Sequence, residues 1–574
     1  MRKLVSFKYW WIIVLLLLLV INFLVSLVPV RLDLTTEKRF TLSQPTRRLL
    51  QDLNEPVSIT VFLDGDMPAG FRKLSNSARE LLQEFRDISK TNLQISFEKP
   101  GEGLDDDARI SFLSYLQDSL GLKPTNVKVT ATAGEAQEER TLYAGALVQF
   151  GNRQLAINLL EGQSLLGGYQ ALNNAEALLE YKFANAIQKI TSSSAPVVGY
   201  LLGNGEPQTY NVYDLIEGTI KPNYGFSFLP INEVPVIPDE FDALVIMKPS
   251  IPFSDDQKLK LDQFVMNGGK IIWLIDALYA EMDSLMRAQS DFLAFDRGLN
   301  LQDILFRYGV RINQDLVQDL QSDKVPLVVG NFGNEPQMQL QPWPYFPVLN
   351  SYSGHPIAKN LDQVLSIFPN SIDTIAVEGV KQTILLASSS NSRSLSTPAV
   401  VSLNSIKTED DLKTFNQQHI PVAVLLEGTF TSLYSNRISQ GKLDTLASLN
   451  LPFQRVTKTP NSMIVIADAD IASNVVTQSE GPLPMGYNQF TNYQYANKEF
   501  ILNCFEYLLN TSGILETRSK DLTLRLLDTK KVNEEKARWQ LINIVVPVLL
   551  VIIFGAVYQF LRSRKYELSP KNPT

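Results

Sequence analysis

The stretch YLLGNGEPQT, residues 200–209, has the outline of a phosphate-binding loop. An apolar run ends in a turn that contains Gly203 and Gly205, and a helix-like segment follows it. A Walker-type loop needs a lysine followed by serine or threonine, and the dinucleotide fingerprint G-x-G-x-x-G needs a third glycine. This turn has neither, because position 208 is glutamine and its charge is the carboxylate of Glu206, which would repel a phosphate. The sequence therefore argues against nucleotide binding here and favours a tight strand-to-helix turn.

Polar residues also follow other apolar runs, at the points where strands are expected to end. In an open parallel sheet, ligands bind outside the carboxyl ends of the strands, so side chains at those ends can line one crevice. Lys248 and Ser388–Ser390 occupy such positions. The residues for which we predict ligand or partner binding are Gly203, Asn204, Gly205, Glu206, Asp276, Glu427, Asp468 and Asp470. The alternative stays open, because polar residues and glycines ordinarily end buried strands and cap the helices that follow.

The chain has few nucleophiles and few metal ligands. It contains one cysteine and two histidines, and it lacks the G-x-S-x-G nucleophile elbow. Cys504 lies in the apolar helical pattern FILNCFEYLL, which indicates a buried thiol rather than a nucleophile. Carboxylates such as Glu206 and Asp468 could do acid–base chemistry only if the fold brought them together. We therefore expect no enzyme activity, no cofactor and no bound metal, and the net charge of −8 argues against a nucleic-acid partner.

An apolar segment near the N-terminus is long enough to cross a bilayer. Residues 10–28 contain no charge, and three basic residues precede them. This pattern predicts an uncleaved transmembrane helix over residues 10–30, with residues 1–9 in the cytoplasm. The competing interpretation is a cleaved signal peptide, but the apolar core is too long for one and no A-x-A-like cleavage site is present.

A second apolar segment near the C-terminus predicts another transmembrane helix over residues 540–561. Basic residues follow it, so the tail 562–574 is expected in the cytoplasm as well. The chain is then a two-pass protein of the inner membrane with a large periplasmic region. Two spans are too few for a translocation path of their own, and Asn22 in the first span is a candidate contact with another membrane helix.

Two folded domains are expected between the spans. The first covers residues 31–193, where runs of strand character flank an amphipathic helix in the order of a parallel βαβ unit. Its expected elements are strands at 57–63 and 93–99, helices at 71–89 and 171–191, and a hairpin that turns at residues 151–152.

Residues 194–515 are predicted to form the second domain, a doubly wound parallel sheet covered on both faces. Continuous apolar strands that alternate with helices are typical of such sheets. The expected strands are 196–202, 226–231, 241–247, 270–276, 383–389, 421–428 and 462–470. An insertion near 325–380 interrupts this pattern, and its segment QPWPYFP is either a protein-contacting loop or aromatic filling against the sheet. Residues 516–539 form a juxtamembrane segment before the second span.

Five segments, taken in order, resemble the GldG family: RLDLTTEKRFTLSQPTRRLL, EPVSITVFLDGDMPAGFRKLSNSARELLQEF, GGKIIWLID, YGVRI and NKEFILNC. That family comprises auxiliary components of a gliding-motility ABC transporter, to which substrate binding is attributed. The similarity runs from the first span to the helix near residue 510. It implies a multi-span permease and a cytoplasmic ABC ATPase as partners, together with envelope or gliding-machinery proteins.

The middle of the chain also resembles extracytoplasmic domains related to intraflagellar-transport proteins, whose fold is similar to class I glutamine amidotransferases. Those enzymes use a cysteine at a strand–helix elbow, and this sequence has none at such a turn, so the resemblance implies a scaffold without that chemistry. The sequence thus predicts an α/β protein: a βαβ-containing N-terminal domain and a doubly wound, amidotransferase-like domain, flanked by two transmembrane helices. We expect an accessory subunit of an ABC transporter; the alternatives are a structural envelope protein that binds no small ligand and a cryptic hydrolase.

Overall fold

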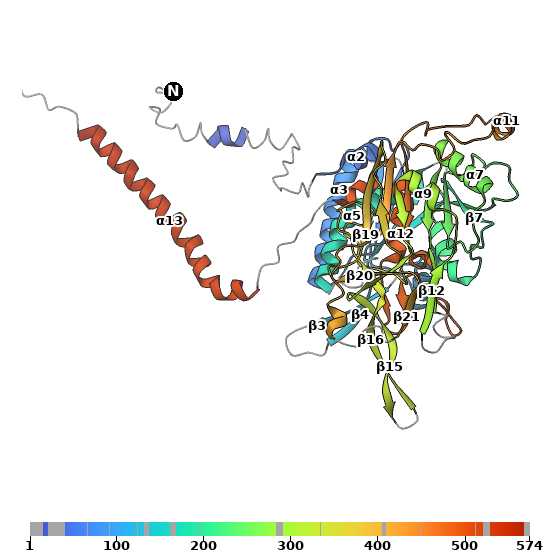
Figure 1. Ribbon diagram of the computed structural model, residues 1–574. Helices are drawn as coiled ribbons and strands as arrows, with labels where there is room; N and C mark the ends of the chain where they lie inside the picture. Colours follow the sequence, from blue (N-terminus) through green and yellow to red (C-terminus); the bar gives the residue numbers. More distant parts are fainter. Residues whose placement is uncertain are drawn as a thin grey trace, which may run out of the picture. The chain divides into compact units, whose positions relative to one another are not determined.

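The structure, a computed structural model, describes residues 15–20, 41–65, 67–90, 92–122, 124–130, 137–160, 168–192, 195–282, 291–332, 335–403, 409–448, 451–510, 512–519 and 529–567. The chain divides into two units, Met1–Asp521 and Leu522–Thr574, which are described separately (Figure 1). Of the first predicted span, only residues 15–20 are described, and they are helical; the rest of that prediction lies outside the described residues.

A four-stranded sheet forms the N-terminal part of the larger unit, in the order β2-β1-β5-β6. Its strands are β1 (Val57–Val61), β2 (Leu93–Phe97), β5 (Gly145–Phe150) and β6 (Arg153–Asn158). β1 and β2 are parallel and joined by α3 (Ala69–Ile88), while β5 and β6 form a hairpin, so the predicted βαβ unit and hairpin are confirmed. The smaller elements are α2 (Gln44–Gln51), α4 (Asp106–Ser114), a π-helical turn (Tyr115–Ser119), β3 (Pro124–Thr130) and β4 (Gln137–Tyr143).

The long helix α5 (Gly168–Thr191) follows this sheet and packs beside α3 (Figure 1). Glu176 fixes the pair, because its carboxylate accepts a hydrogen bond of 2.7 Å from Ser77 Oγ and lies 2.8 Å from Lys73 Nζ. The buried side chains of Phe183 and Ile187 on α5 belong to a core that also contains residues of the central sheet. α5 therefore connects the two sheets through one continuous apolar core.

The central sheet has seven strands, in the order β19-β22-β23-β10-β9-β7-β8. They are β7 (Val197–Leu202), β8 (Gly225–Pro230), β9 (Ala243–Met247), β10 (Lys270–Leu274), β19 (Val380–Ala387), β22 (Pro421–Gly428) and β23 (Asn461–Ile466). β7, β8, β9, β10 and β23 run parallel to one another. β22 runs antiparallel to both β23 and β19, so the prediction of an all-parallel sheet is wrong at this edge.

Alternate side chains of the central strands enter two separate cores. On β10, Ile272 and Leu274 join the core shared with α5, whereas Ile271 and Trp273 join the core on the other face. Each is at most 1% exposed, and burying an aliphatic side chain contributes about 1.5–3 kcal/mol. Because both faces are buried, the strand is a continuous apolar run rather than an alternating one.

The elements between and beside these strands are α7 (Asp255–Met266), α9 (Gln302–Tyr308), α12 (Asn497–Leu509) and the short turns Tyr210–Val212, α6 (Tyr213–Leu215) and Ile216–Ile220.

Local sequence sets the ends of α7. Ser254 Oγ accepts a hydrogen bond from the Gln257 N–H at 3.2 Å, and Gln257 Oε1 accepts one from the Ser254 N–H at 2.8 Å. This capping box, with Asp255 and Asp256 in the first turn, satisfies donors that the helix cannot bond itself and contributes about 1 kcal/mol. Gly268, at φ 106°, follows the last turn.

Between β10 and β19 the chain leaves the central sheet for an excursion that begins at residue 275, well before the predicted insertion at 325–380. Its elements are β11 (Leu278–Tyr279), β12 (Asp291–Asp296), α9, β13 (Val310–Ile312), β14 (Asp315–Asp319), β15 (Ser322–Phe332), β16 (Glu335–Leu349), β17 (Val364–Leu365) and β18 (Ile372–Thr374). β20 (Ser392–Ser396) and β21 (Ala399–Ser402), which follow β19, pair with β14 and β12. β15 and β16 form a long hairpin that extends beyond the neighbouring strands (Figure 1).

The aromatic segment of this excursion is buried. Trp343 and Tyr345 are each 1% exposed, and both rings pack on Phe368 with centroid distances of 5.5 and 5.8 Å. The rings therefore fill a core, as one interpretation expected, but this core belongs to the excursion and its neighbouring strands rather than to the central sheet. The interpretation of these rings as a protein-contacting loop is wrong. After β21 come α10 (Glu409–Leu412), α11 (Gln440–Ser448), the turn Ala469–Ala472, the short strands β24 (Val476–Thr477), β25 (Gly481–Pro482), β26 (Tyr487–Asn488) and β27 (Tyr493–Gln494), and, beyond α12, the turn Ile514–Ser519.

In the smaller unit the described residues form one helix, α13 (Thr529–Glu567). Its portion Glu535–Arg564 is long and apolar enough to cross a membrane, and it contains the second predicted span, 540–561. Among the residues that the structure describes, this is the one helix that meets that criterion.

Candidate functional site

Four parallel strands end at one edge of the central sheet, and each is followed by residues of the predicted site. The turn 203–206 follows β7, Lys248 follows β9, Asp276 follows β10, and Asp468 and Asp470 follow β23. Parallel strands present their carboxyl ends at the same edge, as expected from the sequence. The structure nevertheless divides these residues into a turn and a separate charged cluster.

In the turn after β7, the backbone donors bind a carboxylate of the turn itself. The carboxylate of Glu206 accepts hydrogen bonds from the Gly203 and Asn204 N–H groups at 3.0 and 2.8 Å. These are the kind of backbone donors that bind a phosphate in a nucleotide loop, and here they bind a side chain of the same turn. Burial raises the pKa of Glu206, although the backbone hydrogen bonds oppose that shift. These two backbone donors of the turn are therefore satisfied without an external anion.

Asn204 fastens the turn to the segment that precedes α7. Its side-chain amide donates to Gln257 Oε1 at 3.1 Å and to the Pro252 carbonyl at 3.2 Å, and it is 1% exposed. Gly205 has a φ of 78°, and a Cβ at this position would lie 2.2 Å from Ser250 Oγ. The conformation and the close approach explain why glycine occupies this position.

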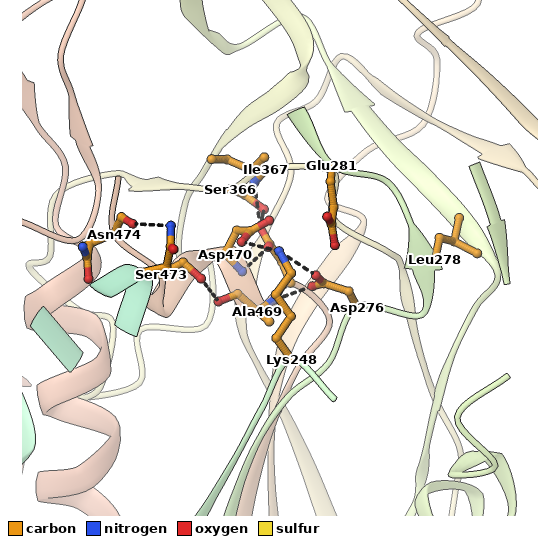
Figure 2. A network of polar contacts seen from close by, with 12 residues as sticks. Lys248, Asp276, Leu278, Glu281, Ser366, Ile367, Ala469, Asp470, Ser473 and Asn474 are labelled. Atoms are coloured by element: carbon orange, nitrogen blue, oxygen red, sulfur yellow. Dashed lines mark hydrogen bonds and ion pairs between the residues drawn. The ribbon is translucent and has the colours of Figure 1, made fainter. Parts of the chain in front are cut away.

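The charged cluster centres on Lys248 (Figure 2). Its Nζ lies 2.6 Å from Asp470 Oδ1 and 3.3 Å from Asp276 Oδ2, so it bridges the ends of β10 and β23. Burial alone would lower the pKa of Lys248, but the carboxylates of Asp470 and Asp276 outweigh burial and raise it. The lysine is therefore held protonated and is unsuited to act as a general base.

A second cation lies beside this group. Arg297 Nη2 is 4.0 Å from Asp276 Oδ2 and 2.7 Å from Glu281 Oε1, and its side chain is 3% exposed. Both Arg297 and Glu281 come from the excursion rather than from the ends of the central strands. The cluster therefore joins the sheet edge to the excursion.

Asp468 is fully buried and bonds to the excursion as well. One carboxylate oxygen accepts hydrogen bonds from the Ser366 hydroxyl and from the Ile367 N–H, the latter at 2.7 Å, and the other accepts from the Asp470 N–H at 2.8 Å. Burial, followed by the charges of Asp470 and Asp276, raises the pKa of Asp468 well above its usual value. Burial likewise raises the pKa of Asp470, against the opposing effect of Lys248.

These contacts tie the cluster into the fold. Asp276 also accepts a hydrogen bond of 2.7 Å from the Ala469 N–H, so each of the three aspartates is held by groups of the fold itself. Figure 2 shows the Lys248 side chain reaching between Asp276 and Asp470, with Ser366 and Ile367 above Asp470 in this view. Ligand or partner binding by this edge stays a prediction, and any ligand would have to compete with internal ion pairs.

Glu427 does not lie at this edge, contrary to the expectation from sequence. β22 is antiparallel, and Glu427 pairs in register with Ser462, at the start of β23. Its carboxylate instead accepts a hydrogen bond of 2.6 Å from the Tyr507 hydroxyl of α12. The physical reason is that an apolar run predicts a strand but carries no signal of strand direction.

Glu206 and Asp468, the two carboxylates considered for acid–base chemistry, accept hydrogen bonds from different sets of donors. Cys504 on α12 is fully buried, and burial raises the pKa of its thiol well above the usual value. Arg297, Glu281 and Ser366 were not predicted from the sequence. No spacing connects them to the strand ends, and Ser366 lies 102 residues before its partner Asp468.

Comparison with known proteins places the chain in a family. It belongs to the family described as ABC-type uncharacterized transport system, an ABC-transporter auxiliary family whose model matches residues 195–504. A domain of unknown function, DUF7088, matches residues 36–149. The first match contains the central sheet, the excursion and most of α12, and the second contains β1, β2 and most of β5.

One curated relative aligns along almost the whole chain. It is a protein of Borreliella burgdorferi described as an uncharacterized protein, 22% identical over 561 residues, which cover 94% of this chain and 95% of the relative. Among solved structures, the N-terminal domain of mmIFT52 matches 55% of this chain and 97% of its own length, with 11% identity and a TM-score of 0.31.

Proposed function

We propose that this protein is an accessory subunit of an ABC transporter that acts by contacting the transporter's permease from outside the cytoplasm. The observation that carries the proposal is the match of residues 195–504 to the auxiliary family. The apolar helix within α13 supports it, because an accessory subunit anchored in the membrane can dock against a membrane-embedded partner.

In this proposal the protein crosses the inner membrane twice, through residues 10–30 and through α13, and the larger unit is periplasmic. Arg562 and Arg564 at the end of α13 favour a cytoplasmic C-terminus. The resemblance to the GldG family extends the proposal to gliding motility, to envelope proteins as further partners and to an amidotransferase-like scaffold without amidotransferase chemistry.

The partners are a multi-span permease and a separate cytoplasmic ATPase. The turn 203–206 uses its backbone donors on Glu206, so nucleotide hydrolysis belongs to another subunit. The protein itself is not an enzyme in this proposal, which the buried thiol of Cys504 and the internally paired aspartates support.

The outer part of the β15–β16 hairpin is the surface that we propose contacts the permease. Val328 and Met338 lie directly opposite each other and are 51% and 61% exposed, and Leu340 beside them is 40% exposed. Aliphatic side chains exposed together on a projecting hairpin are typical of a contact surface. A partner that covers them would remove this apolar area from water.

The test is purification of the full-length protein from its native membranes in mild detergent, followed by identification of the copurified proteins. We expect a multi-span permease and an ABC ATPase with the wild-type protein. The double variant Val328→Asp/Met338→Asp should lose them, because burying two carboxylates in an apolar contact is costly.

The matched control is Gln337→Asp/Gln339→Asp, which adds the same charge to the same strand region but on alternate positions of β16. It should retain both partners. Recovery of neither protein with the wild type would refute the proposal, and equal recovery with the two double variants would refute the role of the hairpin.

A structural envelope protein is the second candidate. The observation in its favour is the pairing of Lys248 with Asp276 and Asp470, which leaves the strand-end edge stabilised without a small ligand. If the protein is a structural envelope protein, other envelope proteins should copurify with the wild-type protein and the ATPase should not.

A further inference from the structure

A cavity of about 400 Å³ lies between α5, α12, the turn Ile514–Ser519 and β6. This volume falls within the range typical of small-molecule sites, about 300–1,000 Å³. Its walls combine apolar side chains such as Leu178 and Leu502 with asparagines and four cationic side chains, against the single carboxylate of Glu499. None of these residues belongs to the strand-end site described above.

Arg518 is the cation that distinguishes this cavity. It is 6% exposed, its Nη1 donates to Asn503 Oδ1 at 3.0 Å, and its guanidinium lies 5.0 Å from the centre of the Tyr181 ring. Within the part of the chain that the structure describes, its Nε–H has no hydrogen-bond partner and no carboxylate lies within ion-pairing distance. A buried cation without a counter-ion is costly, and an anion in the cavity would remove that cost.

The three lysines of the cavity each have an ion-pair partner or hydrogen-bond acceptors of their own. Lys189 pairs with Glu506, and Lys498 lies 2.9 Å from Asp214 Oδ1. Lys182 donates to the carbonyl oxygens of Asn158 and Leu159 at 2.6 and 3.0 Å. Arg518 is therefore the cation on which anion binding in this cavity depends.

Asn185 supplies an independent observation that also points to a ligand. It lines the cavity, is 9% exposed, and donates through Nδ2 to Glu506 Oε1 at 3.3 Å. Its Oδ1 has no hydrogen-bond donor among the described residues. A buried carbonyl oxygen of this kind is ordinarily satisfied, so a ligand that donates a hydrogen bond would complete it.

We propose that this cavity binds a small organic anion that carries a carboxylate or phosphate group and a hydroxyl or amine donor. Arg518 binds the anionic group, and Asn185 accepts a hydrogen bond from the donor. The apolar wall formed by Leu178 and Leu502 packs against the carbon skeleton. Binding here does not depend on the association with a transporter.

The test uses the full-length protein in detergent and follows its thermal unfolding by tryptophan fluorescence, which the buried Trp273 and Trp343 report. Inorganic phosphate and glycerol phosphate probe the phosphate group, and citrate and gluconate probe the carboxylate. Glucose is the neutral control, and sodium chloride at matched ionic strength controls for screening. We expect a saturable rise in Tm with at least one anionic probe, and the arm that succeeds identifies the group.

Arg518→Gln should bind that probe at least tenfold more weakly while the apoprotein keeps its Tm within about 2 °C, because an uncompensated buried charge is removed. Arg311→Gln is the matched control; Arg311 is 54% exposed, pairs with Asp373 and lies outside the cavity, so its binding should equal that of the wild type. Asn503→Asp is a second variant, in which the new carboxylate beside Arg518 supplies the missing counter-ion. It should unfold cooperatively and lose the probe-induced rise.

No rise in Tm of the wild type with any of the four anions, beyond the sodium chloride and glucose controls, would overturn the proposal. So would an undiminished rise in both Arg518→Gln and Asn503→Asp. If Arg518→Gln fails to fold, Asn503→Asp decides the matter alone, because it keeps the guanidinium in place.

Discussion

Replacement of Lys248 by methionine tests whether the charged cluster stabilises the sheet edge. The change keeps much of the aliphatic side chain and removes the cation that lies 2.6 Å from Asp470 and 3.3 Å from Asp276. Both carboxylates are largely buried, with side chains 15% and 10% exposed. Removing one partner of a buried ion pair costs about 3–5 kcal/mol, because the remaining charge is left uncompensated.

This free energy converts to a measurable change in Tm. Unfolding entropy is about 2.1 cal/mol/K per residue, so a unit of roughly 500 residues has an unfolding entropy of about 1 kcal/mol/K. The expected decrease in Tm at neutral pH is therefore about 3–5 °C. Tryptophan fluorescence during heating of the full-length protein in detergent measures it, because Trp273 lies on β10, three residues before Asp276.

The loss of stability should depend on pH. Burial already raises the pKa of Asp470, Lys248 opposes that rise, and removal of Lys248 raises the pKa further. A carboxyl whose pKa is raised in the folded state destabilises that state while it is ionised, and protonation relieves the cost as the pH falls. The difference in Tm between the variant and the wild type should therefore shrink between about pH 7 and pH 4.5.

Lys413→Met is the matched control for this experiment. Lys413 pairs with Asp410 at 2.6 Å, but the two side chains are 77% and 84% exposed, so its loss should cost under about 1 kcal/mol at any pH. A Tm for Lys248→Met equal to that of the control, or a difference from the wild type that does not change with pH, would refute the buried ion-pair interpretation.

Three further outcomes follow from the geometry. Glu206→Ala should lower the free energy of unfolding by about 1–3 kcal/mol, because two buried N–H groups lose their acceptor, and added ATP or phosphate should not restore the wild-type Tm. In double-mutant cycles, Glu427→Gln should be non-additive with Tyr507→Phe but additive with Lys248→Met within about 0.5 kcal/mol; coupling to Lys248 would contradict the antiparallel direction of β22. Cys504 should resist aqueous thiol reagents in the native protein and react once denaturant is added, whereas rapid native labelling would show an accessible thiol.

Elements defined by local sequence were predictable. The βαβ unit, the hairpin at residues 151–152 and the capping of α7 by Ser254 each depend on residues close together in the chain. The strand-end positions of Lys248, Asp276 and Asp468 were also predictable, since an apolar run that ends in a charged residue marks a strand end wherever the strand lies in the sheet.

Features that depend on long-range pairing were not predictable. Glu427 was assigned to the wrong edge because the direction of β22 is set by its partners rather than by its own residues. Ser366 and Arg297 complete the charged cluster from an excursion that sequence periodicity does not connect to the sheet. The negative charge of Glu206 already argued against a bound phosphate. Only the structure shows that its carboxylate accepts the hydrogen bonds that the backbone N–H groups of its own turn donate.

The apolar core that runs from Leu42 to Leu515 has a consequence for synthesis of the protein on the ribosome. α5 is translated roughly 300 residues before α12 and the turn Ile514–Ser519, and it contacts both in the finished unit. At about 5–20 residues per second, the α5 side chains that pack against those later elements wait roughly 15–60 seconds for them. During that interval they are exposed to chaperones and to other nascent chains, so the vulnerable state of this protein is the growing chain rather than the finished fold.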